Sequence, residues 1–156
     1  MSKKTSLQFH WVDYMILFGA LACSLFSWIY TGIHYENLPD QIPSHYNFNG
    51  EADGYSGKEI LFYISGIFTV LMVGVYFLAR SKNMHNIQLK THSANFRSIA
   101  IFMPFLGIIQ SIAIYTMIGD ANQTFGYSSW VLPSILSVTL VFIFLMFAII
   151  HKNKKS

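Results

Sequence analysis

Four long apolar runs limit the folds open to this chain more than any other feature of its sequence. They cover residues 14–33, 60–79, 98–118 and 130–150, and each approaches the roughly 20 residues that a helix needs to cross a bilayer. None alternates between apolar and polar residues as a barrel strand does, and an unpaired backbone amide is costly in lipid. We therefore predict an all-α membrane protein, a four-helix transmembrane bundle that forms a single domain over residues 1–156.

The composition supports a membrane location. Apolar residues make up 53 % of the chain and charged residues only 11 %, and the mean hydropathy is +0.43. A soluble domain of this size could not bury so much apolar surface, so the lipid bilayer is the first partner that the sequence predicts. The first run is too long for the apolar core of a signal peptide, and we expect it to stay in the mature protein.

The basic residues predict the orientation of the bundle. Nine of the ten lie before the first run, between the second and third, or after the fourth, while Lys58 alone lies elsewhere. These nine are Lys3, Lys4, Arg80, Lys82, Lys90, Arg97, Lys152, Lys154 and Lys155. The positive-inside rule therefore places both termini and the loop 80–97 in the cytoplasm, and the loop 34–59 outside.

The cytoplasmic loop 80–97 carries four of these basic residues. We expect it to contact anionic lipid, and the alternative is a docking site for an acidic cytoplasmic regulator. Few aromatic residues lie among its charges, so no nucleic-acid partner is predicted.

Two residues in the first run have chemistry of their own. Cys23 is the single cysteine, which excludes an intramolecular disulfide and favours a packing role. Asp13 lies at the cytoplasmic margin of the run, where a carboxylate needs a partner. We expect it to pair with Arg80 or Arg97, since the polar residues of the other runs are too scattered to indicate a proton or ion relay.

The loop at 34–59 is the least expected part of the chain, because segment 38–59 within it is polar and rich in glycine. Pro39 and Pro43 limit its freedom, and its apolar side chains can fold back on the bundle, so we expect an ordered extracellular loop that caps the helices. The steps Asn49-Gly50 and Asp53-Gly54 predict turns with positive φ.

Three interpretations of the polar groups in this loop remain open. They can bond to the backbone in Asx-turns, with Lys58 paired to an acidic neighbour. His45, Glu51 and Asp53 can instead bind a divalent cation such as zinc or calcium, as a cation site or as the centre of a membrane-embedded metal-dependent hydrolase. In the third interpretation the loop binds an external ligand. The candidate ligand-binding residues are Asp40, His45, Asn47, Asn49, Glu51, Asp53 and Lys58.

The spacing of residues in this loop also resembles that of a known family. Leu38-Pro39, Ile42-Pro43, His45, Asn47, Gly50, Asp53, Gly54 and Lys58 follow the pattern L-P-x-x-I-P-x-H-x-n-x-x-G-x-x-D-g-x-x-x-K. That pattern is similar to the signature of a bacterial membrane domain of unknown function, which forms the first part of SdpI-type immunity proteins. The resemblance implies a multi-pass protein of the bacterial cytoplasmic membrane with an immunity, signalling or peptide-sensing role.

Taken together, these features predict an integral membrane binding or sensor protein. Its extracellular ligand, for which a toxin peptide is the leading class, is recognised through loop 38–59. An enzyme is not favoured, because Ser44 and His45 are neighbours whose side chains point to opposite faces of an extended segment. The metal-dependent hydrolase or cation-binding protein based on His45, Glu51 and Asp53 is the alternative, and no other cofactor is predicted.

Overall fold

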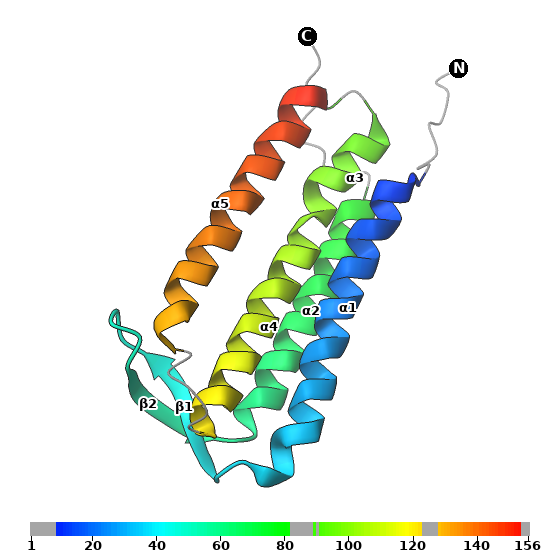
Figure 1. Ribbon diagram of the computed structural model, residues 1–156. Coiled ribbons are helices and arrows are strands. Elements are labelled where there is room, and N and C mark those ends of the chain that lie inside the picture. Colours follow the sequence, from blue (N-terminus) through cyan, green and yellow to red (C-terminus); the bar gives the residue numbers. More distant parts are fainter. Residues whose placement is uncertain (1–8, 82–88, 90, 123–127, 154–156) are drawn as a thin grey trace, which may run out of the picture.

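The chain folds into a bundle of long helices with a small β-hairpin at one end (Figure 1). The computed structural model describes residues 9–81, 89, 91–122 and 128–153, with only the backbone described at 128 and 129. Within these residues, four helical segments are long and apolar enough to cross a membrane. They are Trp11–Asn37, Ile60–Arg80, His92–Ala121 and Trp130–Asn153. The protein is therefore of the multi-pass membrane type.

The first segment comprises helix α1, Trp11–His34, and a short 3-10 helix η1, Tyr35–Asn37. Helix α1 begins three residues before the predicted run. Its start is fixed because the Asp13 carboxylate accepts a hydrogen bond from the His10 backbone N–H at 2.7 Å. A carboxylate is also favourable in the first turn of a helix, where it faces the positive end of the helix dipole.

The third segment is divided into α3, His92–Ala100, and α4, Phe102–Ala121. Pro104 explains the division, because proline has no N–H to bond the Ala100 carbonyl. Helix α3 begins six residues before the predicted run, and the Thr91 hydroxyl caps it by accepting from the Ala94 N–H at 3.1 Å. The predicted loop 80–97 is therefore helical from His92 onward, and its residues 82–88 and 90 lie outside the described part of the chain.

Helix α4 lies at the centre of the arrangement. It packs against α1, against α2 (Ile60–Arg80) and, on its other flank, against α5 (Ser128–Asn153) (Figure 1). The start of α1 and the end of α5 lie at one end of the bundle, which we call the terminal end. The strands lie at the opposite end, which we call the hairpin end. In the spanning part of α5 no residue is buried, although the helix packs against α4 and α3.

The segment between α1 and α2 contains two strands that the sequence analysis did not predict. Strands β1, Gln41–Tyr46, and β2, Ala52–Gly57, pair antiparallel, with Ile42 opposite Ser56 and His45 opposite Gly54. The pairing is irregular on both sides of His45. Such bulges interrupt the apolar and polar alternation by which a strand is recognised in sequence, which is why this hairpin was expected only as an ordered loop.

Two apolar clusters hold the bundle together, one toward each end. The terminal cluster consists of Ala20, Met72, Ala79, Phe96, Ala100 and Met103. The hairpin cluster consists of Leu38, Ile42, Leu61, Ile114, Met117 and Ile118. The outer surface of the helices is also apolar, since Phe18, Val70 and Phe144 are each 70 % or more exposed. Lipid is the solvent in which such a surface is stable.

Two close contacts join α4 and α3 to α1. A Cβ atom added at Gly107 would lie only 2.8 Å from the Cβ of Cys23, so glycine lets these helices approach closely and Cys23 has the expected packing role. At the terminal end, Arg97 makes a bidentate ion pair with Asp13, with Nε to Oδ1 at 2.6 Å and Nη2 to Oδ2 at 3.0 Å. The prediction that Asp13 pairs with one of two arginines is confirmed for Arg97, while Arg80 donates to the Tyr76 hydroxyl.

Candidate functional site

The hairpin is attached to the bundle by its buried apolar residues. Ile42 is fully buried and Leu38 is 4 % exposed, and both belong to the hairpin cluster with Leu61 of α2 and Ile114 of α4. The proline that follows Ile42 limits the backbone of β1 further. The hairpin is therefore anchored by apolar packing against α2 and α4.

Asn47 organises the turn that joins the two strands. Its Oδ1 accepts hydrogen bonds from the backbone N–H groups of Asn49 at 2.9 Å and Glu51 at 3.0 Å. Its Nδ2 donates to Oε2 of Glu51 at 2.9 Å. Gly50 has φ of 80°, as predicted from the Asn49-Gly50 step. Asn47 thus forms an Asx-turn, and its amide and the Glu51 carboxylate are used within the turn.

The predicted turn at Asp53-Gly54 is wrong. Gly54 lies within β2 opposite His45, and among the described glycines only Gly50 has positive φ. A Cβ atom added at Gly54 would lie 2.9 Å from the Cβ of His45. Glycine is therefore needed at position 54 because the irregular pairing brings His45 of β1 close to β2. It is not needed for a turn.

His45 and Asp53 are hydrogen-bonded to each other across the hairpin. His45 Nδ1 lies 2.5 Å from Oδ1 of Asp53, and their side chains are 75 % and 44 % exposed. Glu51, the third proposed metal ligand, is bonded to Asn47 instead. In the part of the chain that the structure describes, no group of three or more His, Cys, Asp or Glu side chains is arranged to hold a metal ion. The Ser44 hydroxyl is bonded to that of Ser56 at 2.8 Å.

Lys58 ties the two ends of the segment together. Its Nζ donates to the Leu38 carbonyl at 3.2 Å and lies 5.1 Å from the centroid of the Tyr35 ring. Oδ1 of Asp40 is 3.7 Å away, but the Asp40 side chain is fully exposed, so this pair contributes little to stability. The Lys58 side chain is thus largely used in holding the segment closed.

Tyr46 is a residue of this site that the sequence analysis did not select. Burial raises the pKa of its hydroxyl, and the negative charge of Asp120, at the end of α4, raises that pKa further. The hydroxyl makes no hydrogen bond of normal geometry to a described residue, so Asp120 acts on it through its charge. The two residues are far apart in the sequence, and only the contact of β1 with α4 brings them together.

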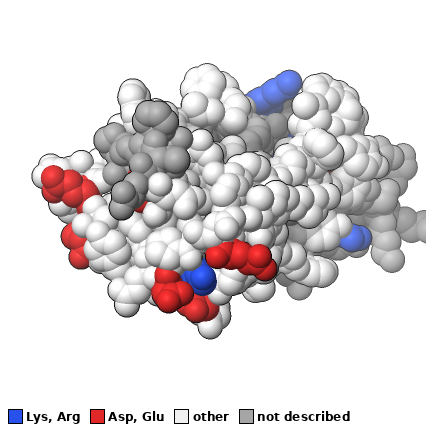
Figure 2. Space-filling view, turned by 60° about the horizontal axis from the view of Figure 1, so that its bottom comes forward, with Lys and Arg blue, Asp and Glu red and all other residues white. Residues whose placement is uncertain are grey.

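The outward face of the hairpin combines aromatic and charged groups. Phe48 at the turn is 93 % exposed and Tyr55 on β2 is 61 % exposed, beside the exposed pair of His45 and Asp53. Figure 2 views this end of the molecule and shows several acidic side chains gathered on it. Of the seven candidate residues, the structure joins His45 to Asp53, Asn47 to Asn49 and Glu51, and Asp40 to Lys58.

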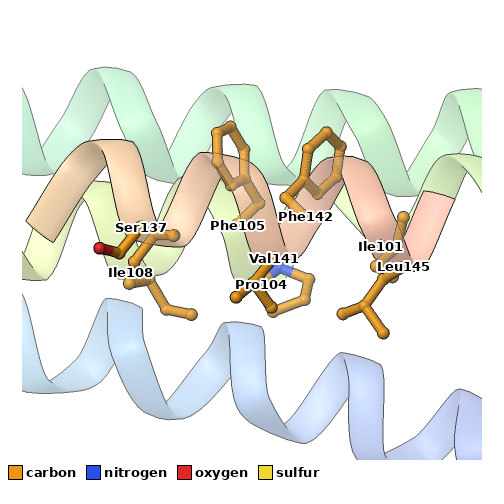
Figure 3. A pocket seen from close by; sticks show the side chains of 9 residues that line it. Ile101, Pro104, Phe105, Ile108, Ser137, Val141, Phe142 and Leu145 are labelled. Carbon is orange, nitrogen blue, oxygen red and sulfur yellow. The ribbon is translucent and has the colours of Figure 1, made fainter. Parts of the chain in front are cut away.

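A groove also lies between α4 and α5 (Figure 3). It has a volume of about 330 Å³ and is lined by Ile101, Pro104, Phe105, Ile108, Ser137, Val138, Val141, Phe142 and Leu145. The Ser137 hydroxyl donates to the Pro133 carbonyl of its own helix at 2.8 Å. The lining of the groove is therefore almost entirely apolar and contains no ionisable side chain. Such a groove can accommodate a lipid acyl chain but offers no catalytic group.

Comparison with known protein families gives a match that includes the hairpin. A family described as "Domain of unknown function (DUF1648)" matches residues 23–69, which comprise the second half of α1, the whole hairpin and the first half of α2. No curated protein and no solved structure matches the chain.

Proposed function

We propose that this protein is a binding or sensor protein of the bacterial cytoplasmic membrane that recognises an external peptide through hairpin segment 38–59. The observation that carries the proposal is the contrast within the hairpin. Leu38 and Ile42 are buried against the helices, whereas His45, Phe48 and Asp53 project from the opposite side. A hairpin that is fixed on the helices and exposes polar and aromatic side chains is suited to recognition, because it loses little conformational freedom on binding.

The charge of the hairpin favours a basic ligand. Asp40, Glu51 and Asp53 lie on the hairpin segment, and the nearby Lys58 cation is engaged with the Leu38 carbonyl. Complementary charge accelerates the encounter with a cationic partner, and exposed aromatic rings such as Phe48 and Tyr55 can contact its apolar side chains. A cationic amphipathic peptide that arrives along the membrane surface has both properties.

The location and the ligand class have further support. Arg80, Arg97 and Lys152 lie toward the terminal end, so the positive-inside rule favours the hairpin end as the outer one. The family match covers the same segment. The spacing of residues in the sequence of that segment resembles that of SdpI-type immunity proteins. A peptide toxin is therefore the class of ligand that we favour.

We favour recognition over the cation-binding or hydrolase alternative. His45 and Asp53 are bonded to each other, and the Glu51 carboxylate is bonded to Asn47. Binding a metal through all three would require the hydrogen bond of His45 to Asp53 and that of Glu51 to Asn47 to be broken. Elemental analysis of protein purified without chelator tests the alternative, since stoichiometric zinc or calcium that is lost in His45→Ala would support it.

The binding proposal can be tested with purified protein in nanodiscs of neutral phosphatidylcholine. The probe is a fluorescent synthetic peptide of alternating Lys and Leu, and its anisotropy reports binding. We expect saturable binding that weakens with salt and falls several-fold in Asp53→Asn and Phe48→Ala. Glu36→Gln is the matched control, because it removes a carboxylate from η1 rather than from the hairpin.

Two results would contradict the proposal. One is equal binding of the Lys-Leu peptide to empty nanodiscs. The other is unchanged binding in the hairpin variants when circular dichroism shows that they are folded. A peptide of alternating Glu and Leu should not bind, and comparable binding of that peptide would show that charge plays no part.

A further inference from the structure

A layer of polar side chains lies between the two apolar clusters, where α1, α2 and α4 meet. Its members are small or neutral and come from all three helices. They are Ser24, Ser27, Thr31, Ser65, Thr69, Gln110 and Ser111. Polar residues are rare in the middle of membrane helices, and where they occur they bond across helices or bind something.

Part of this layer is explained by contacts between helices. The hydroxyls of Ser24 and Thr69 lie 3.2 Å apart and join α1 to α2, and the Trp28 indole N–H donates to Thr69 at 3.1 Å. The hydroxyls of Ser27 and Ser111 lie 3.4 Å apart and join α1 to α4. These four hydroxyls also bond to carbonyls or to one another within the layer, so they need no further partner.

The remaining side chains of the layer are buried without a partner. Gln110, Ser65 and Thr31 are each fully buried. Both side-chain atoms of the Gln110 amide and the hydroxyl oxygens of Ser65 and Thr31 have no hydrogen-bond partner among the described residues. Buried polar atoms in folded proteins are nearly always bonded, to protein or to ordered water, so these atoms require an explanation.

Two of these side chains lie at the same depth in the bundle. Gly107, one turn before Gln110, lies against Met72 of α2, because a Cβ atom added there would be 3.6 Å from the Met72 sulfur. Ile114, one turn after Gln110, packs in the hairpin cluster with Leu61 of α2. Ser65 lies between Leu61 and Met72 on the buried side of α2. Ser65 and Gln110 therefore face the same part of the interface between α2 and α4.

We propose that ordered water is bound at this place, with the Gln110 amide and the Ser65 hydroxyl as its principal ligands. A water molecule can accept from Gln110 Nε2 and donate to Oε1 or to Ser65 Oγ, which satisfies groups that the helices leave unbonded. A cation is a poorer occupant, because the layer has no carboxylate in the described residues, and Asp13 is already paired with Arg97 at the terminal end. An empty space is also disfavoured, since dry cavities are lined by apolar groups.

Water-edited solid-state NMR of the full chain in bilayers with deuterated acyl chains tests this proposal. The chain contains five glutamines, and Gln110-Ser111 is the only Gln-Ser step, so combined labelling of Gln and Ser identifies the Gln110 signals. We expect water magnetisation to reach the Gln110 side-chain amide at a rate comparable to that of Gln41, which is exposed on β1. No transfer to Gln110 at mixing times that saturate Gln41 would overturn the proposal.

Ser65→Ala separates the proposed water site from general hydration of the bundle. We expect this variant to reduce the transfer to Gln110 and to shift its Nε2 resonance. Gly74→Ala is the matched control on the same helix, because an added Cβ there meets nothing within 4 Å. This variant should leave the water transfer to Gln110 and the Nε2 resonance unchanged. If Ser65→Ala kept the wild-type rate of water transfer to Gln110 and the wild-type Nε2 chemical shift, Ser65 would not be a ligand of the water.

Discussion

Arg97 and Asp13 show how a single pair of residues can join two helices in lipid. The Asp13 carboxylate is 1 % exposed and is bonded to both the Arg97 guanidinium and the His10 N–H. Its charge is tolerated because Oδ1 accepts from Arg97 and Oδ2 accepts from both Arg97 and His10. A buried pair of this kind adds little net stability over apolar residues, but it is costly to break.

We therefore predict that Arg97→Ala destabilises the protein by about 3–5 kcal/mol, because it leaves a buried carboxylate without its partner. Thermal unfolding in detergent measures the change. The double variant Asp13→Asn with Arg97→Ala should recover part of the loss. Arg80→Ala is the control, since exposed Arg80 donates to the Tyr76 hydroxyl and not to a buried carboxylate. An equal loss in this control would contradict the assignment.

Residue-level predictions from sequence succeeded where the chemistry is local. The positive φ of Gly50 depends on neighbouring residues and is confirmed. The Asx-turn, one of three interpretations that the sequence left open, is formed by Asn47. Gly54 was wrongly assigned to a turn, because its requirement comes from His45 on the other strand. The effect of the Asp120 charge on Tyr46 depends on tertiary packing, and no short pattern in the sequence could have indicated it.

The helices and the hairpin differ in how far sequence could predict them. Hydropathy located four spans because lipid requires long apolar helices, and the observed bounds differ from the predicted ones by only a few residues except at α3. Helix α3 begins in a polar stretch with Arg97, which hydropathy excludes but the Thr91 cap allows. The hairpin was missed because its bulges and glycines disguise the strand pattern.

The close packing of α1 and α4 predicts different effects for two glycines. Gly107→Ala should destabilise the bundle by about 1–3 kcal/mol, because the new Cβ would overlap with Cys23. Gly74→Ala should be neutral or stabilising by up to about 1 kcal/mol, since it raises helix propensity and its Cβ meets no atom nearby. Melting temperatures in one detergent compare the two, and equal effects would contradict the close contact.

Attachment of the hairpin to the helices is a separate prediction. Ile42→Ala should cost about 2–5 kcal/mol in the hairpin cluster and expose segment 38–59 to proteolysis. Phe48→Ala removes a larger side chain from a 93 % exposed position, and it should leave proteolysis unchanged. Cleavage by proteinase K in proteoliposomes distinguishes the two variants. A hairpin as resistant in Ile42→Ala as in wild type would show that the packing does not anchor it.

For the whole molecule, charge and hydrophobicity act along the same axis. The spanning helices expose apolar side chains to lipid, Arg80, Arg97 and Lys152 lie toward the terminal end, and the hairpin end is acidic. The sequence predicted the position of the basic residues, because that position depends only on which residues lie between and beside the apolar runs. The proposed recognition of an external peptide depends on it too, since the hairpin must face outward.

Cysteine labelling from outside intact cells tests this orientation most directly. In a Cys23→Ala background, Phe48→Cys places a thiol on the exposed turn of the hairpin, and Lys152→Cys places one at the end of α5. A membrane-impermeant maleimide should label Phe48→Cys in intact cells and Lys152→Cys only after the cells are permeabilised. Labelling of Lys152→Cys in intact cells, with Phe48→Cys protected until lysis, would contradict the proposed topology and the recognition role that depends on it.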